Sequence, residues 1–263
     1  MANEAPFDDM FIWYEELYPS VDSSKAYSEY CKRVHGEDLS QQNFCTIDQI
    51  DFMLSEINLS ADSQVLDIGC GTGKLAEYIS NISKATVYGF DYSPTAIRLA
   101  SERTYSKRDK LIFENGDIND KEYPPDTFDA IISVDSLYFA NDLENAITKM
   151  YSWLHLKGML AFYYSVMRFD RKESKDIMSS KKTPLAKALI NAGIAYSVFD
   201  FTKECYEHQK LKRKTALDLK NDFKEEGTIF LFDYLFRESI SEDMSFEDYK
   251  EFCARFLYIC RKT

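Results

Sequence analysis

The stretch from Val65 to Leu75 constrains the fold of this chain more than any other segment. It reads VLDIGCGTGKL, a short apolar run and an acid followed by glycines at positions 69, 71 and 73. An apolar run that is too short for a helix and is bounded by glycine is typical of a buried parallel strand. Glycines after such a strand let the backbone turn tightly and let N–H groups at the start of the next helix point at a ligand. We therefore expect a strand, a turn that binds a nucleotide-like ligand, and a helix from Lys74 onward.

Strand-like and helix-like segments alternate from residue 61 onward, which predicts an α/β fold. Residues 1–60 carry no strand pattern and are expected to be helical. The strands after the first are expected at 86–90, 111–114, 128–134, within 154–166, at 194–201 and at 254–263.

The spacing of the glycines separates two classes of nucleotide site. The dinucleotide fingerprint G-x-G-x-x-G places its last glycine where this chain has Lys74. The turn instead resembles the E/D-x-G-x-G-x-G motif of class I S-adenosylmethionine-dependent methyltransferases, whose four places are taken by Asp67, Gly69, Gly71 and Gly73. The whole chain is similar to small-molecule members of this class, the broad group that includes ubiquinone and menaquinone methylases and amine N-methyltransferases.

The resemblance covers residues 61–201 and the closing strand. It implies a Rossmann-like, doubly wound, seven-stranded sheet whose last strand is antiparallel, together with helical cap elements. We expect residues 1–60 to form a helical N-terminal cap on a methyltransferase core of residues 61–263. Residues 203–250 are expected to be a mainly helical insertion between strands six and seven.

The resemblance also implies S-adenosyl-L-methionine as the cofactor, with contacts at the ends of the first four strands. Asp91, after the second strand, is expected to accept hydrogen bonds from the ribose hydroxyls, although a helix-entry charge would also fit there. Asp117 and Ile118, after the third strand, are expected at the adenine. The expected cofactor contacts are Asp67, Gly69, Cys70, Gly71, Gly73, Asp91, Tyr92, Asp117, Ile118, Ser133, Val134 and Gln42.

The segment DSLYF after the fourth strand is expected to face the methyl group, because ligands of doubly wound sheets bind at the C-terminal ends of central strands. Asp135 and Tyr138 are the candidate catalytic residues, since an acceptor that is an alcohol or a protonated amine must lose a proton. The expected substrate contacts are Tyr27, Tyr30, Tyr138, Tyr164 and His208. For the cap tyrosines, packing of the cap on the core is an equally good interpretation. His208, like His35, also suits an ordinary capping or surface role.

The function implied by the resemblance is methyl transfer to a small-molecule nucleophile, nitrogen or oxygen, by in-line displacement that releases S-adenosyl-L-homocysteine. Two alternatives remain open: a non-catalytic protein that binds the same cofactor for regulation, and an NAD-dependent oxidoreductase, which Lys74 disfavours. The 18 tyrosines and 19 phenylalanines fit either an aromatic pocket for an amine cation or an aromatic core.

Composition narrows the partners and the compartment. A formal net charge of -12 argues against binding to nucleic acid, which requires a basic surface. The six cysteines show no C-x-x-C pair and no zinc-site spacing, so we expect free thiols and no metal. Neither a signal-peptide layout nor an apolar run long enough for a bilayer occurs. We expect a cytoplasmic monomer or homodimer without membrane contact.

Three segments after the fifth strand carry weaker signals. The polar stretch 167–183 is expected to be a loop, with a mobile lid as the alternative. The mixed-charge stretch Lys203–Glu225 is expected to be a long helix with a solvated face. The apolar stretch 228–240 can be a helix or a strand, because periodicity does not distinguish them.

Overall fold

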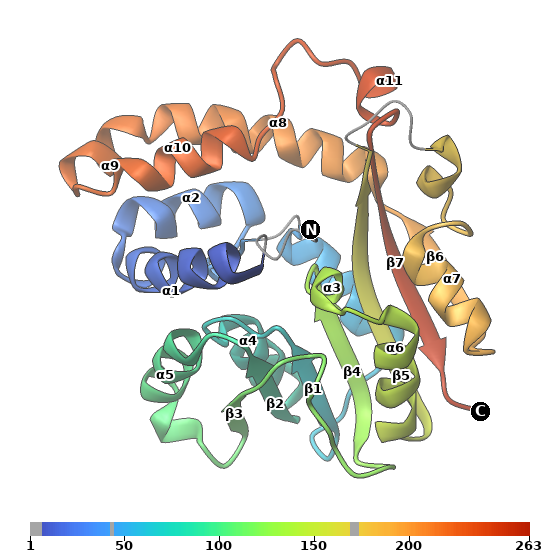
Figure 1. Cartoon of the computed structure of the whole chain (residues 1–263). Helices are drawn as coiled ribbons and strands as arrows, with labels where there is room; N and C mark the ends of the chain where they lie inside the picture. The colour runs from blue at the N-terminus through green and yellow to red at the C-terminus, as the bar shows by residue number, and fades with distance from the viewer. Residues whose placement is uncertain (1–6, 43–44, 169–173) are drawn as a thin grey trace.

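The computed structural model describes residues 7–42, 45–168 and 174–263, and its sheet has seven strands flanked by helices (Figure 1). The strand order is β3-β2-β1-β4-β5-β7-β6. β7 runs antiparallel to both of its neighbours, while the other pairs are parallel. The expected Rossmann-like sheet with an antiparallel last strand is therefore confirmed. The strands are β1 Gln64–Ile68, β2 Thr86–Asp91, β3 Leu111–Asn115, β4 Phe128–Val134, β5 Leu154–Met167, β6 Tyr196–Asp200 and β7 Cys253–Arg261.

β1 lies where the strand order reverses its direction. β2 and β3 follow it on one side, and β4 and β5 follow it on the other. Asp67 on β1 pairs in register with Gly89 on β2 and with Ile132 on β4, so the C-terminal ends of these three strands lie together. Doubly wound sheets bind ligands at this switch point. The topology therefore gathers the glycine turn and the segments after β2 and β4 around one site.

Helices cover both faces of the sheet, and β1 is buried between them. Val65, Leu66 and Ile68 are each at most 1% exposed, as expected for a parallel strand covered on both faces. Two apolar clusters form the core, one beneath α6 and α7 and the other beneath α3 and α4. These helices are α3 Ile47–Ile57, α4 Lys74–Ser83, α6 Leu143–Trp153 and α7 Pro184–Asn191.

The first two helices and the insertion after β6 pack on each other as one helical layer, which lies above the sheet in the view of Figure 1. Tyr27, Tyr30 and Phe223 are fully buried in the apolar cluster that joins them. Glu15 ties this layer to α5, because its carboxylate accepts a hydrogen bond from the Thr95 hydroxyl at 2.6 Å and another from Ser93. α3, by contrast, packs on the sheet. The helices of the layer and their neighbours are α1 Phe7–Ser23, α2 Lys25–His35, α5 Pro94–Arg103, α8 Thr202–Asp218, α9 Lys220–Glu225, α10 Ile229–Arg237 and α11 Phe246–Tyr249.

The stretch Lys203–Glu225 differs from its expected form. The structure divides it at Leu219 into α8 and α9. The predicted solvated face is present on α8, where Lys203, Glu207 and Lys214 are exposed. The helix also runs between α2 and β7, however, and it buries a second face of polar and apolar side chains there. The buried residues of α8 are Thr202, Cys205, Tyr206, His208, Gln209, Lys212, Thr215 and Ala216.

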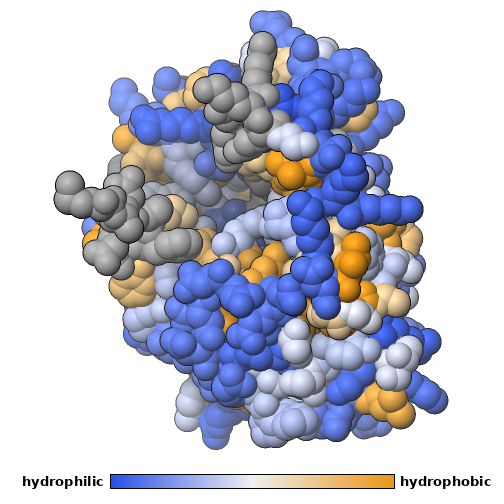
Figure 2. All heavy atoms as spheres, turned by 45° about the vertical axis from the view of Figure 1, so that its right-hand side comes forward, coloured by the Kyte–Doolittle hydropathy of each residue, from blue (hydrophilic) through white to orange (hydrophobic). Residues whose placement is uncertain are grey.

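Two further segments take a definite form. The apolar stretch 228–240 contains helix α10, whose buried side chains pack into the helical layer. Within the stretch 167–183, residues 175–178 form a short 3-10 helix, and residues 169–173 lie outside the described residues. On the face shown in Figure 2, hydrophilic residues predominate and hydrophobic residues form scattered patches.

Gly73, the last glycine of the motif, could be required by its positive φ alone or also by close packing. Comparison of Gly73→Ala with Gly193→Ala separates these two causes. A Cβ on Gly73 would lie 2.6 Å from the Phe113 ring, whereas a Cβ on Gly193 would meet nothing within 4 Å; both glycines have a positive φ. Both substitutions cost about 1 kcal/mol of backbone strain, and Gly73→Ala adds an overpacking cost of about 1–3 kcal/mol. Urea unfolding should show the larger loss for Gly73→Ala. Equal losses would contradict the packing account.

Candidate active site

The turn after β1 adopts a conformation that glycine alone accommodates without strain. Gly69, Gly71 and Gly73 have φ values of +71°, +52° and +72°. A Cβ on Gly69 would lie 2.5 Å from the Ser136 Cβ, so the segment after β4 approaches this backbone closely. Ser136 also donates a hydrogen bond from its hydroxyl to the carbonyl of Ile68 at 2.6 Å. The glycine turn and the segment after β4 are thus locked together.

Two carboxylates face this turn with different degrees of hydrogen bonding. Asp91 accepts hydrogen bonds from the N–H of Gly71 at 2.8 Å and from the N–H of Ser93 at 3.0 Å. Asp67 is 2% exposed, and its Oδ2 has no hydrogen-bond partner among the described residues. Buried polar atoms are normally paired, so this oxygen indicates a donor supplied by a ligand.

Burial changes the ionisation of both carboxyls. It raises the pKa of Asp67 to about 7, with a further contribution from the negative charge of Asp91. Burial also raises the pKa of Asp91 to about 6, although the hydrogen bonds that it accepts from two backbone N–H groups oppose the rise. A cationic group bound beside these carboxyls would favour their ionised forms.

The side of the site beyond β3 combines an acid with an apolar floor. Asp117 is exposed, and its Oδ1 accepts hydrogen bonds from the backbone N–H of Asn119 at 2.8 Å and from its side-chain amide at 2.7 Å. Ile118 and Phe90 are buried beside it and line the same cavity. The arrangement can hold a flat, polar-edged ring.

Aromatic side chains from α1 and from the segment after β4 enclose the site. The rings of Tyr92 and Phe139 stack with centroids 6.0 Å apart, and Tyr14 meets both rings edge-on. Burial, with Asp91 nearby, raises the pKa of Tyr14 to about 12, and the same causes raise the pKa of Tyr18 well above its usual value. At neutral pH both phenols therefore remain hydrogen-bond donors.

Two cavities meet at this point, and we call their combined space the central cleft. The residues shared by both cavities are Gly69, Asp91, Tyr92, Ser136 and Phe139. Asp67, Asp135 and the residues from α1 and the loop after α2 line the first cavity, while Asp117 and Ile118 line the second. The remaining lining of the first cavity is Tyr14, Tyr18, Leu39, Ser40, Gln41, Gln42, Cys45, Ile50, Cys70, Gly71, Thr72, Leu75 and Val134.

Gln42 lines the central cleft with an unsatisfied side chain. Its amide oxygen and nitrogen are both buried and have no hydrogen-bond partner among the described residues. The preceding Gln41 has a different role, because its carbonyl accepts the Tyr27 hydroxyl at 2.9 Å and its Oε1 accepts the N–H of Leu39. Gln41 therefore shapes the loop, and Gln42 is available to a ligand.

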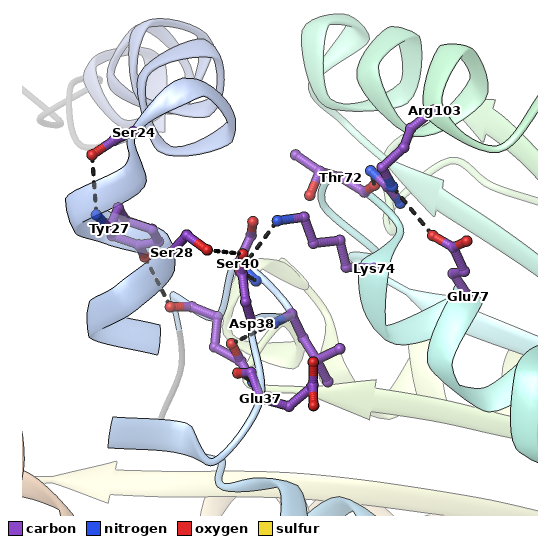
Figure 3. A network of polar contacts seen from close by, with 12 residues as sticks. Ser24, Tyr27, Ser28, Glu37, Asp38, Ser40, Thr72, Lys74, Glu77 and Arg103 are labelled. Atoms are coloured by element: carbon purple, nitrogen blue, oxygen red, sulfur yellow. Dashed lines mark hydrogen bonds and ion pairs between the residues drawn. The ribbon is translucent and has the colours of Figure 1, made fainter. Parts of the chain in front are cut away.

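A polar network holds this loop against the glycine turn (Figure 3). Asp38 accepts hydrogen bonds from the Lys74 ammonium at 3.1 Å and from the Ser28 hydroxyl at 2.6 Å. Although burial opposes it, these donors hold the pKa of Asp38 below its usual value. On the other side of the turn, Arg103 donates to the carbonyl of Thr72 at 2.7 Å. Lys74, which replaces the last glycine of a dinucleotide fingerprint, thus anchors the loop after α2.

Asp135, the residue that follows β4, has a left-handed backbone conformation, with φ of +58°. Such a conformation is costly for a non-glycine residue and recurs at functional sites. Its carboxylate accepts hydrogen bonds from the Arg255 guanidinium at 2.8 Å and from the Tyr138 hydroxyl at 3.0 Å. The Tyr138 oxygen in turn accepts the backbone N–H of Ser165 at 2.6 Å. These contacts hold the Asp135 carboxylate at the wall of the central cleft.

The structure gathers most of the expected cofactor residues at the cleft and leaves several other candidates outside its lining. The Tyr138 hydroxyl lies behind Asp135, so it orients that carboxylate and does not line the cleft. Ser133 lies beneath Ser136, with their hydroxyls 2.9 Å apart. The other expected site residues outside the lining are Gly73, Tyr27, Tyr30, Tyr164 and His208.

Several cleft residues were not expected from the sequence. Tyr14 and Tyr18 lie one helical turn apart in FIWYEELY, a spacing that places both on one face of a helix. Phe139 and Ser136 belong to the segment after the fourth strand that was singled out, but were not assigned to the ligand. Arg255, which lies behind the cleft wall and does not line either cavity, was not expected either. It is the one charged residue in the apolar run ARFLYIC, which is the signal that a charged side chain is buried in a strand.

Other chemistries find little support in the part of the chain that the structure describes. No group of three histidine, cysteine, aspartate or glutamate side chains there could hold a metal ion. All six cysteines lie in the described part of the chain and are buried. None of the described helices is both long and apolar enough to cross a membrane.

The raised pKa of Asp67 predicts how stability depends on pH in the ligand-free protein. A carboxyl whose pKa is higher in the folded state stabilises the fold below its unfolded value, and this contribution is lost as pH rises through about 7. Between pH 5 and pH 8 the melting temperature of Asp67→Asn should therefore rise relative to that of the unmodified protein, by an amount equivalent to about 1–3 kcal/mol. Replacement of the exposed Asp62 by Asn is the matched control. An Asp67→Asn profile parallel to that of the unmodified protein would contradict this account.

Among curated proteins, a phosphoethanolamine N-methyltransferase from Plasmodium falciparum is 40% identical to this chain over 111 residues. The match covers 41% of this chain and 41% of the relative. The chain thus spans less than half the length of this relative.

Solved structures share the fold at low sequence identity. The phosphoethanolamine N-methyltransferase 2 of Haemonchus contortus, in complex with phosphomonomethylethanolamine and S-adenosylhomocysteine, superposes with a TM-score of 0.65 at 15% identity and covers 95% of this chain and 60% of its own. A geranyl diphosphate C-methyltransferase from Streptomyces coelicolor, in complex with Mg²⁺, geranyl diphosphate and S-adenosyl-L-homocysteine, superposes with a TM-score of 0.69 at 13% identity and covers all of both chains. At these identities the likeness shows the fold alone.

The family model described as a methyltransferase domain matches residues 59–236, which include the glycine turn and every strand that lines the central cleft. This match spans more than half of the chain. The chain therefore belongs to the methyltransferase-domain family.

Proposed function

We propose that the protein transfers a methyl group from S-adenosyl-L-methionine to a nitrogen or oxygen nucleophile on a small molecule and releases S-adenosyl-L-homocysteine. The observation that carries this proposal is the unpaired Oδ2 of buried Asp67, which faces the same cleft as the glycine turn and Asp91. A methionine amino group is a cation that such an oxygen accepts, and its charge would relieve the raised pKa of Asp67.

Each part of the cofactor has a counterpart among the cleft residues. Asp67 and Gln42 would bind the methionine end, because both present buried polar atoms without a partner among the described residues. Asp91 would accept the ribose hydroxyls, and Asp117 with Ile118 would receive the adenine. When bound, S-adenosyl-L-methionine supplies an electrophilic methyl group on its sulfonium.

The acceptor is expected at the end of the first cavity that Cys45, Ile50 and Asp135 line. Holding the nucleophile in line with the methyl group supplies much of the catalysis in a displacement of this kind. Asp135 lines this end, and its contacts to Arg255 and Tyr138 fix its orientation. The Asp135 carboxylate can therefore accept a hydrogen bond from the N–H or O–H of the nucleophile and take the proton that is lost.

The curated relatives support a small amine or a similar nucleophile as the acceptor. The Plasmodium and Haemonchus proteins are named for phosphoethanolamine N-methylation. The family assignment does not favour an NAD-dependent oxidoreductase, and Lys74 is used to anchor the loop after α2. The six buried cysteines support a cytoplasmic protein, and the chain's negative charge supports a function without nucleic acid. We expect a monomer or homodimer.

A methyl-transfer assay tests the proposal and separates catalysis from regulatory cofactor binding. Amines, phenols, carboxylic acids and thiols are incubated with the protein and S-adenosyl-L-methionine, and products 14 mass units heavier are sought by mass spectrometry together with S-adenosyl-L-homocysteine. With the accepted substrate, Asp135→Asn should lower kcat by about 10²-fold or more, because proton transfer is lost. Tyr138→Phe should cause a smaller loss, since its hydroxyl only orients Asp135.

The exposed Asp142 caps α6 and does not line either cavity, and Asp142→Asn serves as the matched control. Unchanged turnover in Asp135→Asn would remove Asp135 from the mechanism. Cofactor binding without any methylated product across the four substrate classes would favour a regulatory protein.

A further inference from the structure

A group of basic side chains lies buried behind the acceptor end of the central cleft. Arg255 on β7 is fully buried, and Lys212 and His208 on α8 are 5% and 4% exposed. His35 at the end of α2 is 1% exposed. We call these four residues the basic cluster. Buried cations are rare, and this chain carries a net charge of -12, so the concentration of basic groups inside it calls for a cause.

Arg255 connects the basic cluster to the cleft. Its Nη1 donates to the Asp135 carboxylate at 2.8 Å, and its Nη2 lies 2.9 Å from the Cys45 sulfur. Asp135 and Cys45 both line the cleft, so the guanidinium stands one side chain behind its wall. His35 is tied to the same wall, because its Nδ1 lies 2.8 Å from the carbonyl oxygen of Cys45.

His208 carries buried polar atoms that are available to a ligand. Its ring lies 4.8 Å from that of His35, and neither of its nitrogens has a hydrogen-bond partner among the described residues. Nearby, the Gln209 Oε1 and the hydroxyl of Tyr30, whose ring lies 6.3 Å from that of His35, are also buried without a partner in the described part of the chain. A neutral imidazole carries one N–H donor and one acceptor nitrogen, so a bound group with an acceptor oxygen would satisfy its N–H.

The electrostatics of the basic cluster favour an anion. Burial, together with Lys212, lowers the pKa of His35 to about 3. Burial lowers the pKa of His208 well below its usual value, and His35, Lys212 and Arg255 contribute to this shift. Both rings are therefore neutral at physiological pH. Burial lowers the pKa of Lys212, although the nearby Glu238 and Asp135 oppose this shift, and Arg255, which is paired with Asp135, is the permanent cation of the basic cluster. An anionic oxygen in this position would gain contacts to cations and to a neutral N–H donor.

We propose that the basic cluster binds an anionic group, a carboxylate or a phosphate, of the methyl acceptor. This inference rests on the proposed function, because the acceptor must also reach the methyl group at Asp135. The acceptor then carries its nucleophilic nitrogen or oxygen near the Asp135 carboxylate and its acidic group beyond Cys45, toward Arg255, Lys212 and His208. The substrate class is a small amino or hydroxy compound with an acidic group at its other end.

Thermal shifts with inorganic phosphate and with succinate test this assignment on the whole chain. Each anion is added alone and with saturating S-adenosyl-L-homocysteine, and sodium chloride of equal ionic strength is the reference. A ligand that binds only the folded state raises the melting temperature. At least one of the anions should raise it above the chloride reference, and the comparison of phosphate with succinate identifies the kind of acid.

Variants on α8 show where the anion binds. In Lys212→Met and in His208→Phe, about ten times more anion should be needed for the same rise in melting temperature. Both variants should retain the shift caused by S-adenosyl-L-homocysteine. Replacement of Lys214, which is exposed on the same helix, by Met is the matched control and should change neither shift. His208→Phe removes no charge, so it remains informative if Lys212→Met does not fold.

The two proposals fail separately in this experiment. If neither anion exceeds the chloride reference, or if both variants keep the full anion shift, the assignment of the basic cluster is overturned. If the anions act as expected but S-adenosyl-L-homocysteine causes no shift, the proposed function fails and the anion site stands.

Discussion

The hydrogen bonds that Asp91 accepts from Gly71 and Ser93 connect the parts on which this site depends. One bond fixes the glycine turn after β1, and the other fixes the start of α5. Ser93 and Thr95 then hold Glu15 and with it α1, whose tyrosines close the cleft. A single buried carboxylate thus joins the sheet to its cap, and burial raises its pKa. A ligand that donates a hydrogen bond to the neighbouring Asp67 carboxyl would offset part of the free-energy cost of burying these two acids.

A buried ion pair organises the opposite end of the cleft. Arg255 and Asp135 meet across the sheet, from β7 to the end of β4. Loss of one partner of a buried pair leaves an uncompensated charge and is strongly destabilising, whereas the pair itself adds little stability. Its value is therefore orientation, because the left-handed Asp135 carboxylate remains at the cleft wall. The proposed cofactor site and the proposed acceptor site therefore each have a buried polar anchor.

The sequence predicted the features that local chemistry determines. The glycine turn and the acid after β2 follow from backbone constraints and from strand ends, and the structure places Asp67, Asp91, Asp117 and Asp135 around one cleft. The role of Arg255 was missed because its contact with Asp135 depends on β7 lying beside β5. No local sequence pattern reveals that placement. Lys212 was assigned to a solvated face because its charged neighbours concealed the one face of α8 that packs inward. Tyr14 and Tyr18 required knowledge of where α1 docks.

The account depends most directly on what the central cleft binds, and calorimetric titration measures this. We predict that S-adenosyl-L-homocysteine binds at one site per chain, that NAD gives no binding heat, and that Asp91→Ala weakens the affinity at least about tenfold, because charge-assisted hydrogen bonds to the ribose are lost. Saturable binding of NAD without binding of S-adenosyl-L-homocysteine, or an affinity unchanged by Asp91→Ala, would contradict the account.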